Sequence, residues 1–428
     1  MNTKTYINSY PYRFLSSARD RLTVRFEKDK LKEIISRQGE SFQAEVIQDG
    51  KIGTASSNQP GKEILLEKAV DSAQFGDKVD YEYVTHEITS KPKLYSEAVS
   101  GIGPEELIDL GKFLIKAIKE VNSEILVDVS LSKAIGNSSL EHSGGFSYSQ
   151  KETSWSVSVE GELVSEGDIL TIGDYYSWKD KTFEREKFSE DIKERFKLAQ
   201  KIVEVTPGKM PVIFTPDVVL TLLEPAILAL SAQSVYKKVS KWDTELNNQV
   251  ADKRFTMFDD PLIDFAEASI AVDDEGVPTK VLSLIENGVL KNFYSDLKHA
   301  RKLNITPTGH GFGVPASPSL INLIINPGEK PSADLIKGIK QGILVDQVIG
   351  AGQDSPYSGD FSLNIHLGFL IENGVVVGRI KNLMVSGNIF EMLKNQLGEI
   401  SNDRRWLGGS ANIPYLLFEN VNIIGKES

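Results

Sequence analysis

Segments in which apolar and polar residues alternate constrain the fold of this 428-residue chain more than any other feature. ILVDVSLS (125–132) and SWSVSVEGEL (154–163) alternate strictly, and residues 21–57 do so in shorter runs. A period of two places successive side chains on opposite faces of a strand, so these segments predict half-buried sheets. The pair Asp49-Gly50 lies between two such segments and favours a two-residue hairpin turn.

Three further segments have apolar residues at helical spacing. GKEILLEKAVDSAQFG (61–76) ends on a glycine, and PEELIDLGKFLIKAIKEV (104–121) begins with proline and has acidic residues in its first turn. A charged helix is expected from about Phe183 to Val203. Strand pairs with helices on one side indicate an α+β fold.

A domain boundary is expected near residue 205. TPGKMPVIFTP (206–216) combines turn residues, a short strand and a helix N-cap followed by proline. Strand signals are denser beyond it, and two Ile-Glu-Asn-Gly-Val segments (285–289 and 371–375) each predict a hairpin. We expect an N-terminal α+β domain over residues 1–204 and a strand-rich, antiparallel or mixed β domain over residues 205–428.

Composition excludes several classes of function. The chain has no cysteine, which excludes disulfides, thiolate zinc sites, iron–sulfur clusters and a cysteine nucleophile. Its formal charge is −12 and it has no dense basic run, so nucleic-acid binding is not expected. The N-terminus lacks an apolar leader, and no apolar run approaches the roughly 20 residues that cross a bilayer. We therefore expect a cytoplasmic protein that does not contact membranes.

Two short polar motifs resemble metal sites without meeting their requirements. His86-Glu87 has no second histidine one helical turn later, so a surface histidine is expected. The segment 273–276 (Asp-Asp-Glu-Gly) lacks the spaced carboxylates of an EF-hand and favours a simple turn.

Two other segments remain candidates for a site. TGHGFG (308–313) is not followed by the helix that a phosphate cradle needs, so a loop is expected, and loops often bind ligands. Residues 351–369 contain Asp360, Ser362 and His366, which could form a hydrolytic cluster, although the required triad geometry cannot be read from sequence. A structural turn is the simpler interpretation of that segment.

Three ordered blocks resemble the TldD/PmbA family, whose members are described as modulators of DNA gyrase and as metallopeptidases. The blocks are FAEASIAVDDEGVPTKVLSLIENGVLKNFYSDLKHARKL (265–303), TPTGHG (306–311) and SGDFSLNIHLGFLIENGVVVGRIKNLMVSGNIFEML (358–393). The resemblance covers most of the chain from about Arg21 onward.

In the zinc-bearing half of that family, a helix carries His-Glu-x-x-x-His. The two histidines and a cysteine bind zinc, which activates water, and the glutamate acts as general base. The matching stretch here, VVLTLLEPAILALSAQSVY (218–236), has Glu224, Pro225 and Ala229 at those positions. A catalytic zinc needs three protein ligands, so the resemblance implies a subunit of the TldE/PmbA type that lacks the metal site. Proline should kink this helix, and its leucines favour burial.

By resemblance, such a subunit has no cofactor, because zinc is expected only in a catalytic partner. The partner would be a zinc-bearing TldD-type paralogue or a second copy of the chain, and the ligand an unfolded peptide held as an added β-strand. The resemblance places these residues in the peptide groove: Gly309, His310, Gly311, Gly359, Asp360 and Phe361. Two alternatives stay open, namely an active hydrolase with a displaced site at Asp360, Ser362 and His366, and a gyrase-associated regulator, which the acidic charge does not favour.

Overall fold

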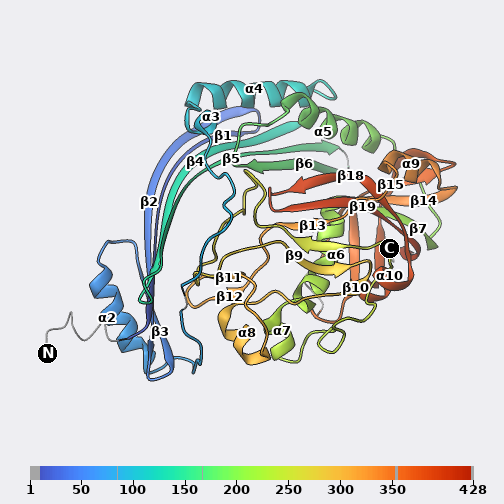
Figure 1. The fold of residues 1–428 in the computed structure, drawn as a ribbon. Helices are drawn as coiled ribbons and strands as arrows, with labels where there is room; N and C mark the ends of the chain where they lie inside the picture. Colours follow the sequence, from blue (N-terminus) through green and yellow to red (C-terminus); the bar gives the residue numbers. More distant parts are fainter. Residues whose placement is uncertain (1–9, 84, 166, 352–354, 426–428) are drawn as a thin grey trace.

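The computed structural model describes residues 10–425 apart from 84, 166 and 352–354, and over these residues it confirms the predicted α+β fold (Figure 1). The first sheet is antiparallel, with the strand order β3-β2-β1-β4-β5-β6. In Figure 1 it forms a long curved arch. Its strands are β1 (Tyr12–Glu27), β2 (Lys30–Gln48), β3 (Lys51–Ser57), β4 (Leu126–His142), β5 (Ser147–Ser165) and β6 (Asp168–Trp178).

The predicted turn and strands of this sheet are confirmed. Strands β4 and β5 are longer than expected. Asp49 and Gly50 join β2 to β3 with positive φ angles of 50° and 71°. The strand expected over 125–132 continues to His142, because its small polar residues still pair with β1 on one side and β5 on the other. Polar residues such as Asn137 and Ser139 are tolerated there because they are exposed, and an antiparallel sheet can have one face in solvent.

Helices cover the outer face of the arch (Figure 1). Pro104 occupies the first turn of α4, Glu105 and Glu106 follow it, and the apolar stripe of α4 is buried against the sheet. The third predicted helix is α5, which is shorter than expected at both ends. The helices that precede β7 in the chain are α2 (Lys62–Ala73), α3 (Glu97–Ser100), α4 (Pro104–Lys119) and α5 (Arg185–Ala199).

The second sheet is mixed, because β7 is parallel to β14 and β13 is parallel to β19. Strands β19, β17, β15, β14 and β7 pair in that order, and the pairing of β7 with β19 closes them into a ring. Its strands are β7 (Gly208–Phe214), β8 (Met257–Asp259), β9 (Leu282–Glu286), β10 (Val289–Leu290), β13 (Leu323–Ile325), β14 (Gln341–Ile349), β15 (Asp360–Glu372), β16 (Val375–Arg379), β17 (Leu383–Asn388), β18 (Leu397–Leu407) and β19 (Ala411–Gly425). A small separate ribbon consists of β11 (Gly311–Phe312) and β12 (Ser317–Pro318).

Both predicted Asn-Gly hairpins are present in this sheet. Asn287-Gly288 joins β9 to β10 and Asn373-Gly374 joins β15 to β16, each with positive φ at both residues. The helices that follow β7 in the chain are α6 (Pro216–Ala229), α7 (Ala232–Tyr236), α8 (Leu297–Leu303), α9 (Ser332–Lys337) and α10 (Ile389–Asn395). Among the described residues, no helix is long and apolar enough to cross a membrane.

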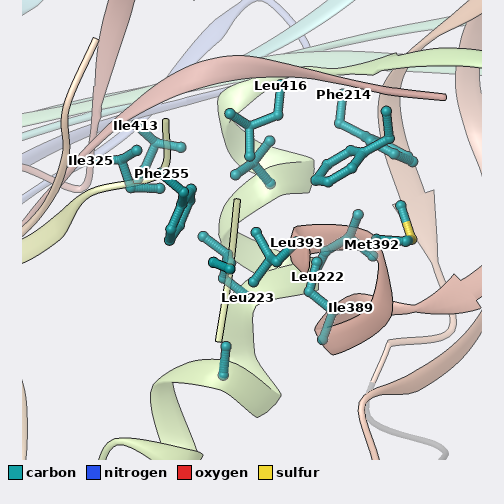
Figure 2. Close-up of a cluster of buried hydrophobic side chains, with 14 of the residues drawn as sticks. Phe214, Leu222, Leu223, Phe255, Ile325, Ile389, Met392, Leu393, Ile413 and Leu416 are labelled. Carbon is teal, nitrogen blue, oxygen red and sulfur yellow. The ribbon is translucent and has the colours of Figure 1, made fainter. Parts of the chain in front are cut away.

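Helix α6 supplies the centre of the larger hydrophobic core. Leu222 and Leu223 lie among side chains from β7, β19 and α10, including Phe214 and Leu416 (Figure 2). The helix can occupy this place because most of its residues are apolar.

Replacing Leu223 with alanine should lower the free energy of unfolding by about 2–5 kcal/mol, because it leaves a cavity in this core. The matched control is Leu246→Ala, whose side chain is 44% exposed and should change that free energy by less than about 0.5 kcal/mol. Denaturant unfolding of both variants measures the difference. Equal losses would contradict the central position of α6.

Candidate functional site

Positions 224, 225 and 229, which by the sequence resemblance match a zinc motif, lie in the last two turns of α6. Glu224 is exposed, Pro225 is half-buried and Ala229 is buried in the core. The helix continues through Pro225 to Ala229. The burial expected from the leucines therefore holds for the side of α6 that carries Leu222 and Leu223, whereas the side that carries Glu224 faces outward.

A small cavity of about 70 Å³ adjoins this outward side of α6. We call it the α6 cavity. It brings Glu224 and Pro225 next to three of the predicted groove residues, Gly359, Asp360 and Phe361. Its lining is completed by Thr221, Leu222, Gly350, Ala351, Ser355, Pro356 and Leu363.

The residues of the α6 cavity do not fit a zinc ion. Glu224 can supply carboxylate oxygen, but proline and alanine at positions 225 and 229 have no ligand atom, whereas a catalytic zinc takes three protein ligands. Within the described part of the chain, no group of three or more His, Asp or Glu side chains is arranged to hold a metal. No step of metal-assisted hydrolysis can be assigned to these residues.

One edge of β15 beside the α6 cavity has no strand partner among the described residues. Asp360–Asn364 pairs with β17, whereas the pairing with β14 begins only at Asn364, opposite Ile349. The free edge of Asp360–Leu363 therefore offers backbone N–H and C=O groups to an added strand. Asn388 holds the start of this strand, because its Nδ2 donates to Asp360 Oδ1 at 2.8 Å.

The structure does not bring Asp360 and His366 together. Asp360, Ser362 and His366 project from the same face of β15, because strand side chains alternate with a period of two. A strand rises by about 3.3 Å per residue, so the six steps from Asp360 to His366 span about 20 Å. A hydrogen-bonded catalytic pair requires about 3 Å.

The loop 308–313 is in the interior and does not line the α6 cavity. His310 is 0% exposed, and its ring nitrogens contact Asp259 Oδ2 at 3.1 Å and Thr308 Oγ1 at 2.9 Å. Gly309 has a φ of +77°, and a Cβ at Gly311 would lie 2.0 Å from the Glu275 carboxylate. These glycines allow close packing, which their sequence pattern alone did not indicate.

The turn expected at residues 273–276 is confirmed, but its carboxylates point into the protein. Asp273 accepts hydrogen bonds from the backbone N–H groups of Glu275, Val277 and Gly311. Glu275 Oε2 accepts from the N–H of Leu297, whereas no described residue donates to its Oε1. A turn rich in carboxylates is usually exposed, so no pattern in the sequence indicated this burial.

A buried ion pair ties this turn to the first sheet. Arg13 is 0% exposed, and its Nε and Nη2 donate to the two oxygens of Glu45 at 3.0 and 2.7 Å. Its Nη1 and Nη2 also donate to the carbonyls of Asp274 and Gly313, at 2.7 and 2.9 Å. The Tyr83 hydroxyl donates to the same Glu45 carboxylate. One guanidinium thus connects β1 and β2 with the turn 273–276 and the loop 308–313.

Several known proteins are similar to this chain in sequence or in fold. Residues 207–425 match the family model of the PmbA/TldA metallopeptidase C-terminal domain. An uncharacterized protein of Methanocaldococcus jannaschii is 27% identical over 366 residues, which are 82% of each chain. A metalloprotease of Methanothermobacter thermautotrophicus is 24% identical over 404 residues, which are 90% of this chain and 87% of its own. The crystal structure of TldE from Thermococcus kodakarensis shares the fold, with a TM-score of 0.90 and 23% identity over 97% of each chain.

Burial affects the protonation of Asp273 and Glu275. It raises the pKa of Asp273 to about 7, although three N–H donors act in the opposite direction. Burial and the neighbouring Asp273 raise the pKa of Glu275 well above its ordinary value. Because the unfolded carboxyls have a pKa of about 4, the folded chain binds protons more tightly. This contribution to stability is complete below about pH 4 and is lost as pH rises through the raised pKa values.

Glu275→Gln should therefore gain stability relative to the wild type as pH rises from about 5 to about 8, by at most about 1.4 kcal/mol per pH unit. The amide oxygen can still accept from Leu297, and the side chain has no proton to lose. Urea unfolding at several pH values measures the difference. Glu82→Gln changes an exposed carboxylate and should follow the wild-type profile. Parallel profiles for the wild type and Glu275→Gln would show that the pKa of Glu275 is not raised.

Proposed function

The chain belongs to the PmbA/TldD family of metallopeptidases, and we propose that it is a metal-free member that binds extended peptide for a catalytic partner. The observation that carries this proposal is the replacement of the zinc motif by Glu224, Pro225 and Ala229 on α6. Zinc hydrolysis needs a metal-bound water and a base near it. Neither proline nor alanine can supply a ligand or a base.

The geometry beside α6 supports peptide binding without catalysis. An extended peptide would pair with the free edge of Asp360–Leu363, and these backbone hydrogen bonds would not depend on its sequence. Pro225 has no N–H, so it cannot make the helical hydrogen bond to the carbonyl of Thr221, which lines the same cavity. The α6 cavity would hold one small side chain of the peptide.

The catalytic partner in this proposal is a zinc-bearing paralogue of the TldD type. Self-association with a second copy of the chain is the other proposed assembly, and it would add peptide-binding surface but no catalytic group. A subunit that only binds peptide needs such a partner, because it has no group to activate water. The alternative of a displaced hydrolytic site is not favoured, since Asp360 and His366 are about 20 Å apart along β15. The formal charge of −12 gives a gyrase-associated role no support.

We expect the purified chain to contain no stoichiometric zinc and to bind a fluorescein-labelled unfolded peptide without cleaving it. Elemental analysis, fluorescence anisotropy and mass spectrometry of the incubated peptide test these points. One tightly held zinc per chain, or cleavage by the chain alone, would contradict the metal-free role.

Glu224→Trp should fill the mouth of the α6 cavity and weaken peptide binding about tenfold, which corresponds to about 1.4 kcal/mol. Glu194→Trp is the matched control, because Glu194 is also exposed on a helix but lies on α5, outside the α6 cavity. Anisotropy titrations of both variants should give wild-type affinity for the control alone. An unchanged affinity for Glu224→Trp would place the peptide elsewhere.

A further inference from the structure

A second cavity, of about 420 Å³, lies where the first sheet meets the second. In Figure 1, β6 and β18 run side by side at this place. The rings of Trp178 on β6 and Trp406 on β18 are in edge-to-face contact, with centroids 4.9 Å apart. We call it the charged cavity. Six charged residues from six different elements line it: Glu160 of β5, Asp174 of β6, Arg195 of α5, Asp217 of α6, Asp346 of β14 and Arg405 of β18.

Two of the three aspartates have arginine partners. Asp174 is held by both guanidinium groups, by Arg195 Nη2 at 3.0 Å and by Arg405 Nη2. Arg405 Nη1 also lies 3.2 Å from Asp217 Oδ2. Arg195 Nη2 and both terminal nitrogens of Arg405 are thus directed at Asp174 and Asp217, and Arg195 Nε donates to the carbonyl of Asp191.

Asp346 does not have an equivalent partner. Its side chain is 11% exposed, and Arg195 Nη1 is 3.6 Å from its Oδ2, too far for a hydrogen bond. Among the described residues, none donates a hydrogen bond to this buried oxygen. A buried carboxylate without a donor is costly, and burial correspondingly raises the pKa of Asp346.

The charge of the cavity also favours a cation. Three carboxylates face two guanidinium groups, which leaves a net charge of −1, and the exposed Glu160 adds another negative charge to the lining. A metal ion does not fit, because no described group of three His, Asp or Glu side chains is arranged to hold one. A ligand that supplied the hydrogen bond that Asp346 Oδ2 lacks would therefore be an organic cation with N–H donors.

The walls of the cavity suit an aliphatic stem. Leu407 and the Tyr175 ring supply apolar surface, and Tyr175 is 47% exposed, so the cavity is accessible from solvent. At Gly408 a Cβ would have no neighbour closer than 3.9 Å, which leaves that wall open. A compact ammonium on a flexible stem matches a single free carboxylate oxygen. A planar guanidinium prefers a carboxylate with both oxygens free, and the two oxygens of Asp174 are already occupied by Arg195 and Arg405.

We propose that the charged cavity binds the primary ammonium group of an amine, with Asp346 as its anchor and with Tyr175 and Leu407 against its stem. The ammonium can belong to a free amine or to a lysine side chain of a peptide. This inference does not depend on the proposed peptide role, because the charged cavity and the α6 cavity share no lining residue.

Calorimetric titration of the full chain with two ammonium probes tests the proposal. Cadaverine represents a free amine, and N-acetyl-lysine N-methylamide represents a peptide lysine. N-acetyl-norleucine N-methylamide has a similar stem without the charge. We expect at least one ammonium probe to bind and the norleucine probe not to bind. Binding of cadaverine alone identifies a free amine as the ligand, and binding of the lysine probe extends the class to peptides.

The Asp346→Asn variant should bind the ammonium probe at least about tenfold more weakly, because the amide keeps the shape but loses the charge. Asp334→Asn removes the same charge from an exposed position on α9 and should leave the affinity unchanged. If circular dichroism shows that Asp346→Asn does not fold, Tyr175→Ala replaces it and should weaken binding through the lost stem contact. The proposal is overturned if neither ammonium probe binds, if the norleucine probe binds equally well, or if the folded variant keeps wild-type affinity.

Discussion

The buried guanidinium of Arg13 is the interaction on which the arrangement of the two sheets depends. A charge in the interior is tolerated only when its donors are satisfied, and Arg13 has the Glu45 carboxylate and two backbone carbonyls as acceptors. Arg13 and Glu45 lie opposite each other on β1 and β2. The carbonyls belong to Asp274 and Gly313, so the remaining donors of Arg13 are satisfied only when the turn 273–276 and the loop 308–313 are in place beneath the arch. Burial opposes the charge of Arg13, but Glu45 beside it raises its pKa well above the ordinary value.

Two polar clusters at the junction of the sheets differ in one physical respect. Around Arg13, the donors and acceptors are nearly all matched, which stabilises a fixed contact. Around Arg195 and Arg405, one aspartate oxygen has no donor and the cluster adjoins open space. The first arrangement joins the sheets, whereas the second has the free hydrogen-bonding capacity that a ligand requires.

Helix α6 has different roles on its two sides. Its buried side packs in the centre of the larger core, and this packing does not require ligands on the outward side. The outward side can therefore carry Glu224 and Pro225 while β15 keeps its free edge beside it. The structural element that a catalytic relative would use for zinc is here a wall of a small cavity.

Local patterns in the sequence were sufficient for most strands of the first sheet, for its longer helices and for several turns, but not for many short elements of the second sheet. The strand pairs, the three predicted helices and the Asp-Gly and Asn-Gly turns follow from side-chain periodicity and from backbone conformations that particular residues favour. The absence of cysteine and the residues at positions 224, 225 and 229 were also evident without a structure.

Only the tertiary structure decided which polar groups meet, because that depends on contacts between distant segments. The glycines at 309 and 311 resembled a binding loop but allow close packing, and the carboxylates at 273 and 275 resembled an exposed turn but are buried. Asp360 and His366 are near in sequence, yet a strand keeps them apart. Conversely, Asp174 and Arg405 are 231 residues apart in sequence and form one ion pair. Periodicity records which face of an element is buried, but it does not record what that face will contact.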